Sequence, residues 1–150
     1  MLTDFLLAAL HHLLFFGLIV MLSVESAVLR GPIDARALQR LGRIDAGYGL
    51  TAVLLLVAGV LRIVFGLKGW DFYAHNPWFH AKLGAFLLAA LLSAVPTVHI
   101  LRWRRAHRRD PAALPGPADA ARLRPWIGIQ YALLAVILVC AAGMARHGGL

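Results

Sequence analysis

The chain has 150 residues, of which 61% are hydrophobic and 15% are charged, and its net charge at neutral pH is +8. Together with a mean hydropathy of +0.75, this composition is too apolar for a soluble domain of that size. The only cysteine of the sequence, Cys140, excludes an intrachain disulfide. We therefore expect an integral membrane protein.

Four apolar stretches follow one another along the chain, and each has about the ~20 residues that a helix needs to cross the hydrocarbon core. The strand-type alternation that a membrane barrel requires is absent from the sequence. The N-terminus has neither the basic region nor the cleavage site of a signal peptide, so the first stretch is expected to be retained. The sequence predicts an all-α integral membrane protein, with a single domain over 1–150 that forms a four-transmembrane-helix bundle with spans at about 5–29, 48–67, 78–101 and 126–145.

The basic residues predict the orientation of the bundle. Segments 30–47 and 102–125 hold eleven of the 15 lysines and arginines, and loops of this charge remain in the cytoplasm. We expect these segments to be cytoplasmic loops and both termini to lie outside, as in a multi-pass protein of the bacterial inner membrane with periplasmic termini. The middle connection carries Trp70, Phe72 and Tyr73, which we interpret as an aromatic belt at the outer membrane surface.

The arginine-rich run that starts at Arg102 raises the question of nucleic-acid binding. Positive cytoplasmic loops explain this run better, so no nucleic-acid partner is expected. Contact with anionic lipid of the inner leaflet is a secondary role that its charge favours.

In the first span, two ionisable residues share one helix face. At about 100° per residue, Glu25 lies about 40° around the axis from His11, whereas His12 points toward a flank. A carboxylate in the membrane core requires protein or water around it, so the face of His11 and Glu25 is expected to point into the bundle.

The same arithmetic separates the residues of the later spans. Arg62 aligns within about 20° of Thr51 in the second span, while Lys82 and His80 of the third span lie about 160° apart. Lys82 is therefore expected to face the bundle and His80 the membrane interface. At ~1.5 Å per residue, His11, Arg62 and Lys82 lie about 9, 8 and 6 Å below the outer helix ends, which predicts one outer-leaflet site that uses all three.

A second polar level is predicted near the cytoplasmic face. Either Arg43 or Asp45 could pair with Glu25 across helices. The level comprises Glu25, Arg43, Asp45, Tyr48, His99 and Gln130.

A histidine and a lysine within a four-helix bundle favour haem as the cofactor, because imidazole is its commonest axial ligand and bundle cores hold haem. A lysine amine removed from water can lose its proton, as metal ligation requires. Arg62 could neutralise a propionate through paired contacts. The sequence lacks Cys-x-x-Cys-His, which excludes covalent attachment. Copper is an alternative, and Lys82 and Arg62 could instead extend outward to the headgroups.

The run 78–83, Trp-Phe-His-Ala-Lys-Leu, resembles the Trp-x-His-x-Lys-Leu motif of HemJ-type bacterial membrane protoporphyrinogen oxidases. His11 occupies the place of that family's helix-one histidine. The resemblance implies that His11 and Lys82 contact haem. The chain has Tyr48-Gly49-Leu50 where that family has Pro-Gly-Met, so the resemblance supports haem binding more than porphyrinogen oxidation.

Nearly the whole chain also resembles a family of bacterial predicted four-helix membrane proteins of unknown function. The resemblance rests on short motifs spread over the first three spans. They are Glu25 before Arg30, Arg43-x-Asp45 leading into Tyr48-Gly49, Gly59-x-Leu61-Arg62, and Asn76-Pro77 before Lys82-Leu83. This family implies no particular activity.

These observations lead to one hypothesis and two alternatives. The hypothesis is a membrane redox protein that binds haem b at an outer-leaflet site, with His11 and Lys82 as axial ligands, supported by Arg62 and with His80 as a further candidate contact. His12 or His80 could replace a ligand. An oxidoreductase of this kind would act on a porphyrinogen or a quinol, and a homo-oligomer fits the hypothesis. The alternatives are a copper- or proton-handling transport protein without haem, and a structural subunit of a membrane complex.

Overall fold

The computed structural model describes residues 1–66 and 69–146, and these residues are predominantly helical. Four helices are long and apolar enough to cross a membrane, which confirms the predicted all-α architecture of four spans. The elements in chain order are α1 (Leu2–Val28), α2 (Ala35–Phe65), the short α3 (Gly69–Ala74), α4 (Pro77–Arg109) and α5 (Pro117–Arg146). Leu67, which ends the second predicted span, lies outside the described residues.

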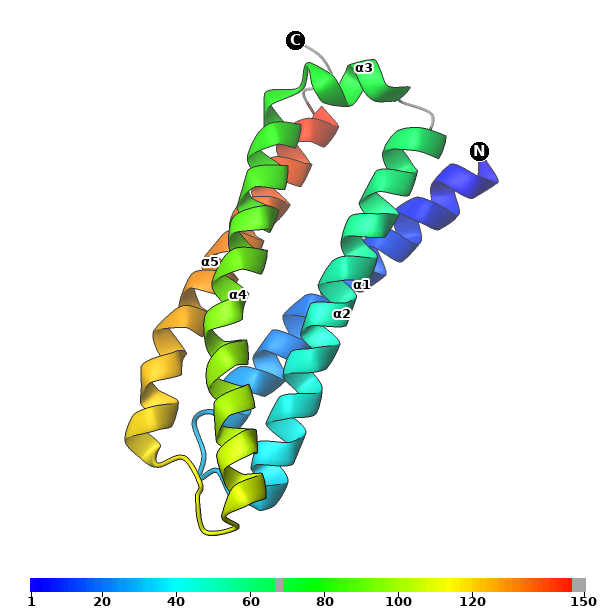
Figure 1. Ribbon diagram of the computed structural model, residues 1–150. Coiled ribbons are helices and arrows are strands. Elements are labelled where there is room, and N and C mark those ends of the chain that lie inside the picture. The colour runs from blue at the N-terminus through cyan, green and yellow to red at the C-terminus, as the bar shows by residue number, and fades with distance from the viewer. Residues whose placement is uncertain (67–68, 147–150) are drawn as a thin grey trace.

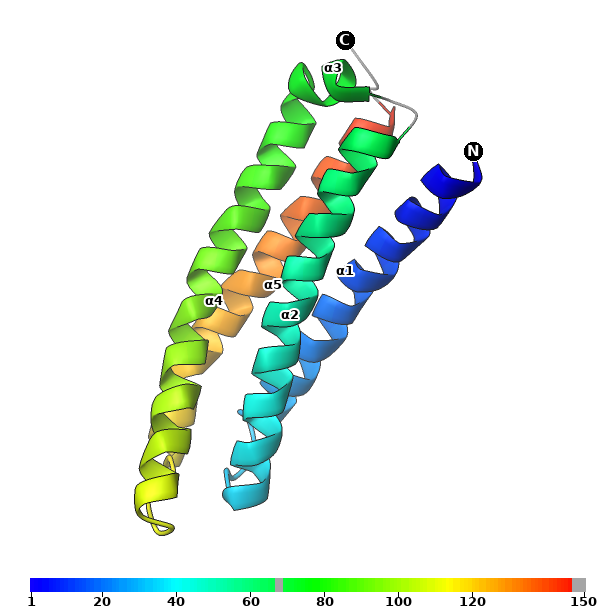
Figure 2. The same ribbon diagram turned by 45° about the vertical axis from the view of Figure 1, so that its right-hand side comes forward.

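The long helices form two hairpins. α1 packs along α2 and α4 packs along α5, whereas the hairpins meet chiefly through α2 and α4 and only slightly through α1 and α5. The hairpins lie close together at the end that holds the connections 29–34 and 110–116, and they diverge toward the end that holds the start of α1, the end of α5 and α3 (Figures 1 and 2). We name these the closed end and the open end.

Helices extend into both arginine-rich segments that were expected to form loops. Segment 30–47 is helical from Ala35 onward, and segment 102–125 is helical to Arg109 and again from Pro117. The side chain of Asp34 caps α2 by accepting a hydrogen bond from the Ala37 backbone N–H at 2.7 Å. The expectation of long loops was wrong because arginine, although polar, is a strong helix former.

The buried core lies toward the closed end. Its fully enclosed side chains include Leu22 of α1, Leu41 of α2, Ile100 of α4 and Leu123 of α5. The outward faces are also apolar, with exposed large side chains such as Leu91, which is 70% exposed. Helices that are apolar on all sides belong in lipid, so the surface of the bundle agrees with a bilayer environment.

Candidate functional site

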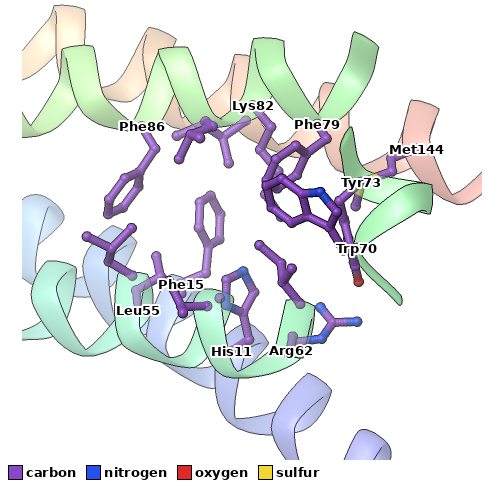
Figure 3. Close-up of a pocket in the computed structure, with 16 residues that line it drawn as sticks. His11, Phe15, Leu55, Arg62, Trp70, Tyr73, Phe79, Lys82, Phe86 and Met144 are labelled. Atoms are coloured by element: carbon purple, nitrogen blue, oxygen red, sulfur yellow. The ribbon is translucent and has the colours of Figure 1, made fainter. Parts of the chain in front are cut away.

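A cavity of about 340 Å³ lies between the two hairpins toward the open end. All five helices contribute to it, and its walls are mainly aliphatic and aromatic (Figure 3). Three polar side chains that line it can carry positive charge, namely His11, Arg62 and Lys82. The sequence analysis predicted these three at one level of the membrane. The lining residues are His11, Phe15, Leu55, Leu56, Gly59, Val60, Arg62, Ile63, Trp70, Tyr73, Phe79, Lys82, Leu83, Phe86, Ile137 and Met144.

His11 enters the cavity from α1. Its ring lies against Gly59 of α2, where an added Cβ would stand 3.4 Å from the imidazole Cε1. The absence of a side chain at Gly59 therefore leaves room for the ring between the two helices. The Nδ1 atom of His11 is buried and has no hydrogen-bond partner. A buried ring nitrogen without a partner is an exception that requires an explanation, such as a ligand or water that the structure does not contain.

Lys82 lies on the opposite wall, in the second turn of α4 (Figure 3). The start of that helix is fixed by Asn76, whose side chain accepts a hydrogen bond from the Trp78 backbone N–H at 3.0 Å, and by Pro77 at the first helical position. Proline is favoured at this position because its missing N–H would have no partner within the helix. The cap therefore sets where Lys82 enters the cavity.

Arg62 completes the group from the last turn of α2. Its Nε atom is buried without a hydrogen-bond partner. Both Arg62 and Lys82 lie within electrostatic range of His11 and of each other. Among the described residues that line the cavity there is no aspartate or glutamate, so this part of the protein favours an apolar ligand that carries negative charge.

Two other candidate histidines lie outside the cavity. His12 is exposed, and its Nδ1 is 2.6 Å from the Ala8 carbonyl oxygen. His80 is also exposed, and its Nε2 is 2.9 Å from the carbonyl oxygen of Ala74, at the end of α3. Both therefore point away from the ligand space, as the helical spacing indicated.

Sequence reasoning missed the aromatic walls of the cavity. Phe15 follows His11 by four residues and Phe86 follows Lys82 by four, so helical spacing alone could have placed each on the face of its ionisable neighbour. Tyr73 was interpreted as part of an interfacial belt. It is instead 6% exposed and lines the cavity, whereas Trp70 of the same short helix is 64% exposed and lies at the rim.

The second polar level is present near the closed end, with a changed membership. Glu25 of α1 and Asp45 of α2 are both buried and lie within electrostatic range of each other. Thr97 of α4 donates a hydrogen bond to Asp45 at 2.7 Å, and Tyr48 of α2 donates one to the side-chain oxygen of Gln130 on α5. Four helices therefore meet at this level.

Arg43 does not join this group, because its side chain is exposed. Of the two residues that could have paired with Glu25, Asp45 is the one within electrostatic range of it. Arg104 of α4 is the arginine that approaches this level. The side chain of Arg104 lies against Gly42, where an added Cβ would stand 2.5 Å from the Cδ of Arg104. Arg104 is also within electrostatic range of Asp45. Arg104 follows Thr97 by seven residues, a spacing that places both on one helix face.

His99, also expected at the second polar level, satisfies its ring locally. Its Nδ1 is 2.9 Å from the Val95 carbonyl oxygen, one turn earlier in α4. Its ring also makes an edge contact with Trp103, with the centroids 6.5 Å apart. Within residues 1–66 and 69–146, no group of three or more His, Cys, Asp or Glu side chains could hold a metal ion.

Comparison with known proteins identifies the family. The chain belongs to the family described as "Predicted membrane protein (DUF2214)", whose model matches residues 3–149. Neither a curated protein nor a solved structure matches the chain. Membership of this family agrees with the four membrane-spanning helices of the structure.

Proposed function

We propose that this member of the DUF2214 membrane protein family binds haem b in the cavity at the open end and has a redox role. His11 and Lys82 would be the axial ligands, and Arg62 would pair with a propionate. The observation that carries the proposal is the convergence of these three side chains on one apolar cavity from different helices. The pieces of a haem site are an axial nitrogen, an apolar enclosure and a cation for the propionates.

The donor set fits haem better than a bare metal ion. The described residues offer no cluster of three metal-ligating side chains, but a porphyrin brings four nitrogen ligands of its own and requires only axial ones from the protein. His11 Nδ1 is buried and unsatisfied, and Lys82 comes from the opposite wall. The Nε–H of Arg62 is buried without a hydrogen-bond acceptor. A propionate carboxylate of haem would supply that acceptor.

The cavity walls support the same assignment. Phe15, Phe79 and Phe86 place aromatic rings around the space between His11 and Lys82 (Figure 3). Apolar walls exclude water and favour a flat hydrophobic ligand over a hydrated ion. The resemblance of residues 78–83 to the HemJ-type motif is a further reason for the proposal. Bound haem would supply one-electron redox chemistry, and its partner would be a hydrophobic donor or acceptor, a quinone or a porphyrinogen.

The test is an absorption spectrum of the detergent-purified protein, first air-oxidised and then reduced with dithionite. Wild type is expected to show a Soret band and the α and β bands of a reduced b-type haem. His11→Ala and Lys82→Ala are each expected to weaken or shift these bands, because each would remove one of the two proposed iron ligands. His12→Ala is the matched control, because His12 is adjacent in sequence but exposed.

Two results would contradict the proposal. One is a wild-type protein that stays colourless after haemin is added. The other is a spectrum that changes as much in His12→Ala as in His11→Ala, since that would place the ligand outside the cavity.

Copper is the second candidate, and one observation favours it. Met144 lines the cavity, and the buried Cys140 lies within electrostatic range of Lys82. A thioether and a thiol are the soft ligands that Cu(I) prefers. If copper is the ligand, the purified wild type is colourless in the haem test and elemental analysis finds stoichiometric copper in it. Met144→Leu is expected to lose this copper.

A further inference from the structure

Glu25 is the most completely buried acidic side chain of the closed end. It is 2% exposed, and its Oε1 atom has no hydrogen-bond partner. The neighbouring core residues Leu22 and Leu29 are fully buried as well. An ionised carboxylate removed from water without compensating contacts is very costly, and such a group takes up a proton instead.

The groups that face Glu25 from the other helices do not compensate a negative charge. From α2, Asp45 adds a second carboxylate within electrostatic range of Glu25. The hydroxyl of Tyr48, also on α2, donates its hydrogen bond to Gln130 of α5 and not to Glu25. From α4, the cation Arg104 lies within range of Asp45. The level therefore contains two carboxyl groups and one nearby cation.

Three further ionisable side chains near this end, His99, Arg124 and Arg43, have other contacts or are exposed. His99 contacts its own backbone at Val95. Arg124 donates hydrogen bonds to the Leu29 carbonyl oxygen at 3.2 and 3.3 Å. Arg43 is exposed. None of them supplies a second positive charge to the carboxyl pair.

We propose that Glu25 and Asp45 form a proton-binding site, in which Glu25 carries the proton and Asp45 carries the negative charge. Asp45 has both a hydrogen-bond donor, Thr97, and a nearby cation, Arg104. Glu25 Oε1 has no hydrogen-bond donor. Two ionised carboxylates within electrostatic range of each other in a low-dielectric interior are costly unless each is paired, and a proton on Glu25 removes one of the two charges.

The proton site is separate from the cavity. Glu25 lies 14 residues after His11 on the same helix, which corresponds to about 21 Å along the axis. The buried side chains of Leu18 and Leu134 belong to the core between the two levels. The proposal therefore stands independently of haem binding, and its test needs no cofactor.

The sequence allows an unusually clean test, because Glu25 is the only glutamate in the chain. Infrared spectra of the purified protein at neutral pH are expected to contain the carbonyl stretch of a protonated carboxylic acid. Carboxyl-¹³C-glutamate, introduced by cell-free synthesis, should move this band to lower frequency, whereas ¹³C-aspartate should leave it in place. This assignment needs no substitution and so does not depend on a variant that folds.

Variants then test the division of charge within the pair. Glu25→Gln should remove the band, and Asp45→Asn should retain it. Asp110→Asn, in the exposed connection between α4 and α5, is the matched control and should have no effect. The proposal is overturned if the wild type has no such band or if only ¹³C-aspartate shifts it. A band removed by sodium chloride but not by choline chloride would overturn it in favour of a metal-cation site.

Discussion

At the scale of single residues, one position along a helix changes the surroundings of a side chain completely, because each step turns it by about 100°. His11 lines the cavity while His12 contacts its own helix backbone, and Lys82 lines the cavity while His80 lies outside it. Helical periodicity could predict these choices from the sequence. It could not predict that Arg104 rather than Arg43 approaches Asp45, because that depends on which faces of α2 and α4 meet.

Gly143 is a residue whose role becomes visible only in three dimensions. An added Cβ at Gly143 on α5 would stand 2.6 Å from Cδ2 of the Trp78 indole on α4, and a rigid ring cannot bend away as a long side chain can. We expect Gly143→Ala to destabilise the fold by about 1–3 kcal/mol, the usual cost of overpacking. Thermal unfolding in detergent, followed by circular dichroism, would report the lower midpoint.

The control for this prediction is Gly128→Ala. Gly128 lies on the same helix, and an added Cβ there would have no atom within 4 Å. Its unfolding midpoint should stay close to that of wild type. Equal midpoints for the two variants would mean that Trp78 does not require the close approach of Gly143.

At the scale of helices, the existence of each span could be predicted from apolar length, but the ends could not. The arginine-rich start of α2 and end of α4 are polar. Hydropathy therefore predicts spans that are shorter than these helices by two turns or more. The actual ends depend on local caps such as Asp34. Because α4 has 33 residues, about 50 Å at 1.5 Å per residue, it is longer than the ~30 Å hydrocarbon core and projects beyond it.

The cap at the start of α4 is expected to contribute measurably to stability. Asn76 is 3% exposed, and its side chain accepts from the Trp78 N–H. Asn76→Ala leaves that donor without its partner and should cost about 1 kcal/mol, while Asn76→Ser keeps an acceptor and should recover most of the loss. Chemical unfolding in mixed micelles would separate the two variants. A serine variant as unstable as the alanine variant would show that the amide acts through packing alone.

At the scale of the whole molecule, the two-hairpin arrangement determines what each end of the bundle can contain. The hairpins are joined through α2 and α4 and by the polar level at the closed end, and they diverge around the cavity at the open end (Figure 1). The depth arithmetic could place His11, Arg62 and Lys82 at one level. It could not indicate the cavity or its aromatic walls, because a cavity depends on how far the hairpins separate.

The charge distribution predicts which end faces the cytoplasm, and this can be measured directly. Replacing the only cysteine by Cys140→Ala gives a background into which single cysteines can be placed. A membrane-impermeant maleimide is expected to label Thr3→Cys at the open end in intact cells, because the positive-inside rule predicts that the arginine-rich closed end stays inside. Ala112→Cys in the connection 110–116 should react only after the membrane is permeabilised. The reverse labelling pattern would show that the closed end faces the outside and would contradict the predicted orientation.

The division into hairpins also orders events during synthesis. Because α1 and α2 precede α4 and α5 along the chain, a chain synthesised only as far as α2 contains His11 without Lys82, and Asp45 without Thr97 or Arg104. Neither polar level is complete until α5 has been added, because Gln130 and Met144 lie on that helix. A chain that ends after α2 therefore contains Glu25 and Asp45 without their neighbours on α4 and α5, and only the α1 and α2 sides of the cavity.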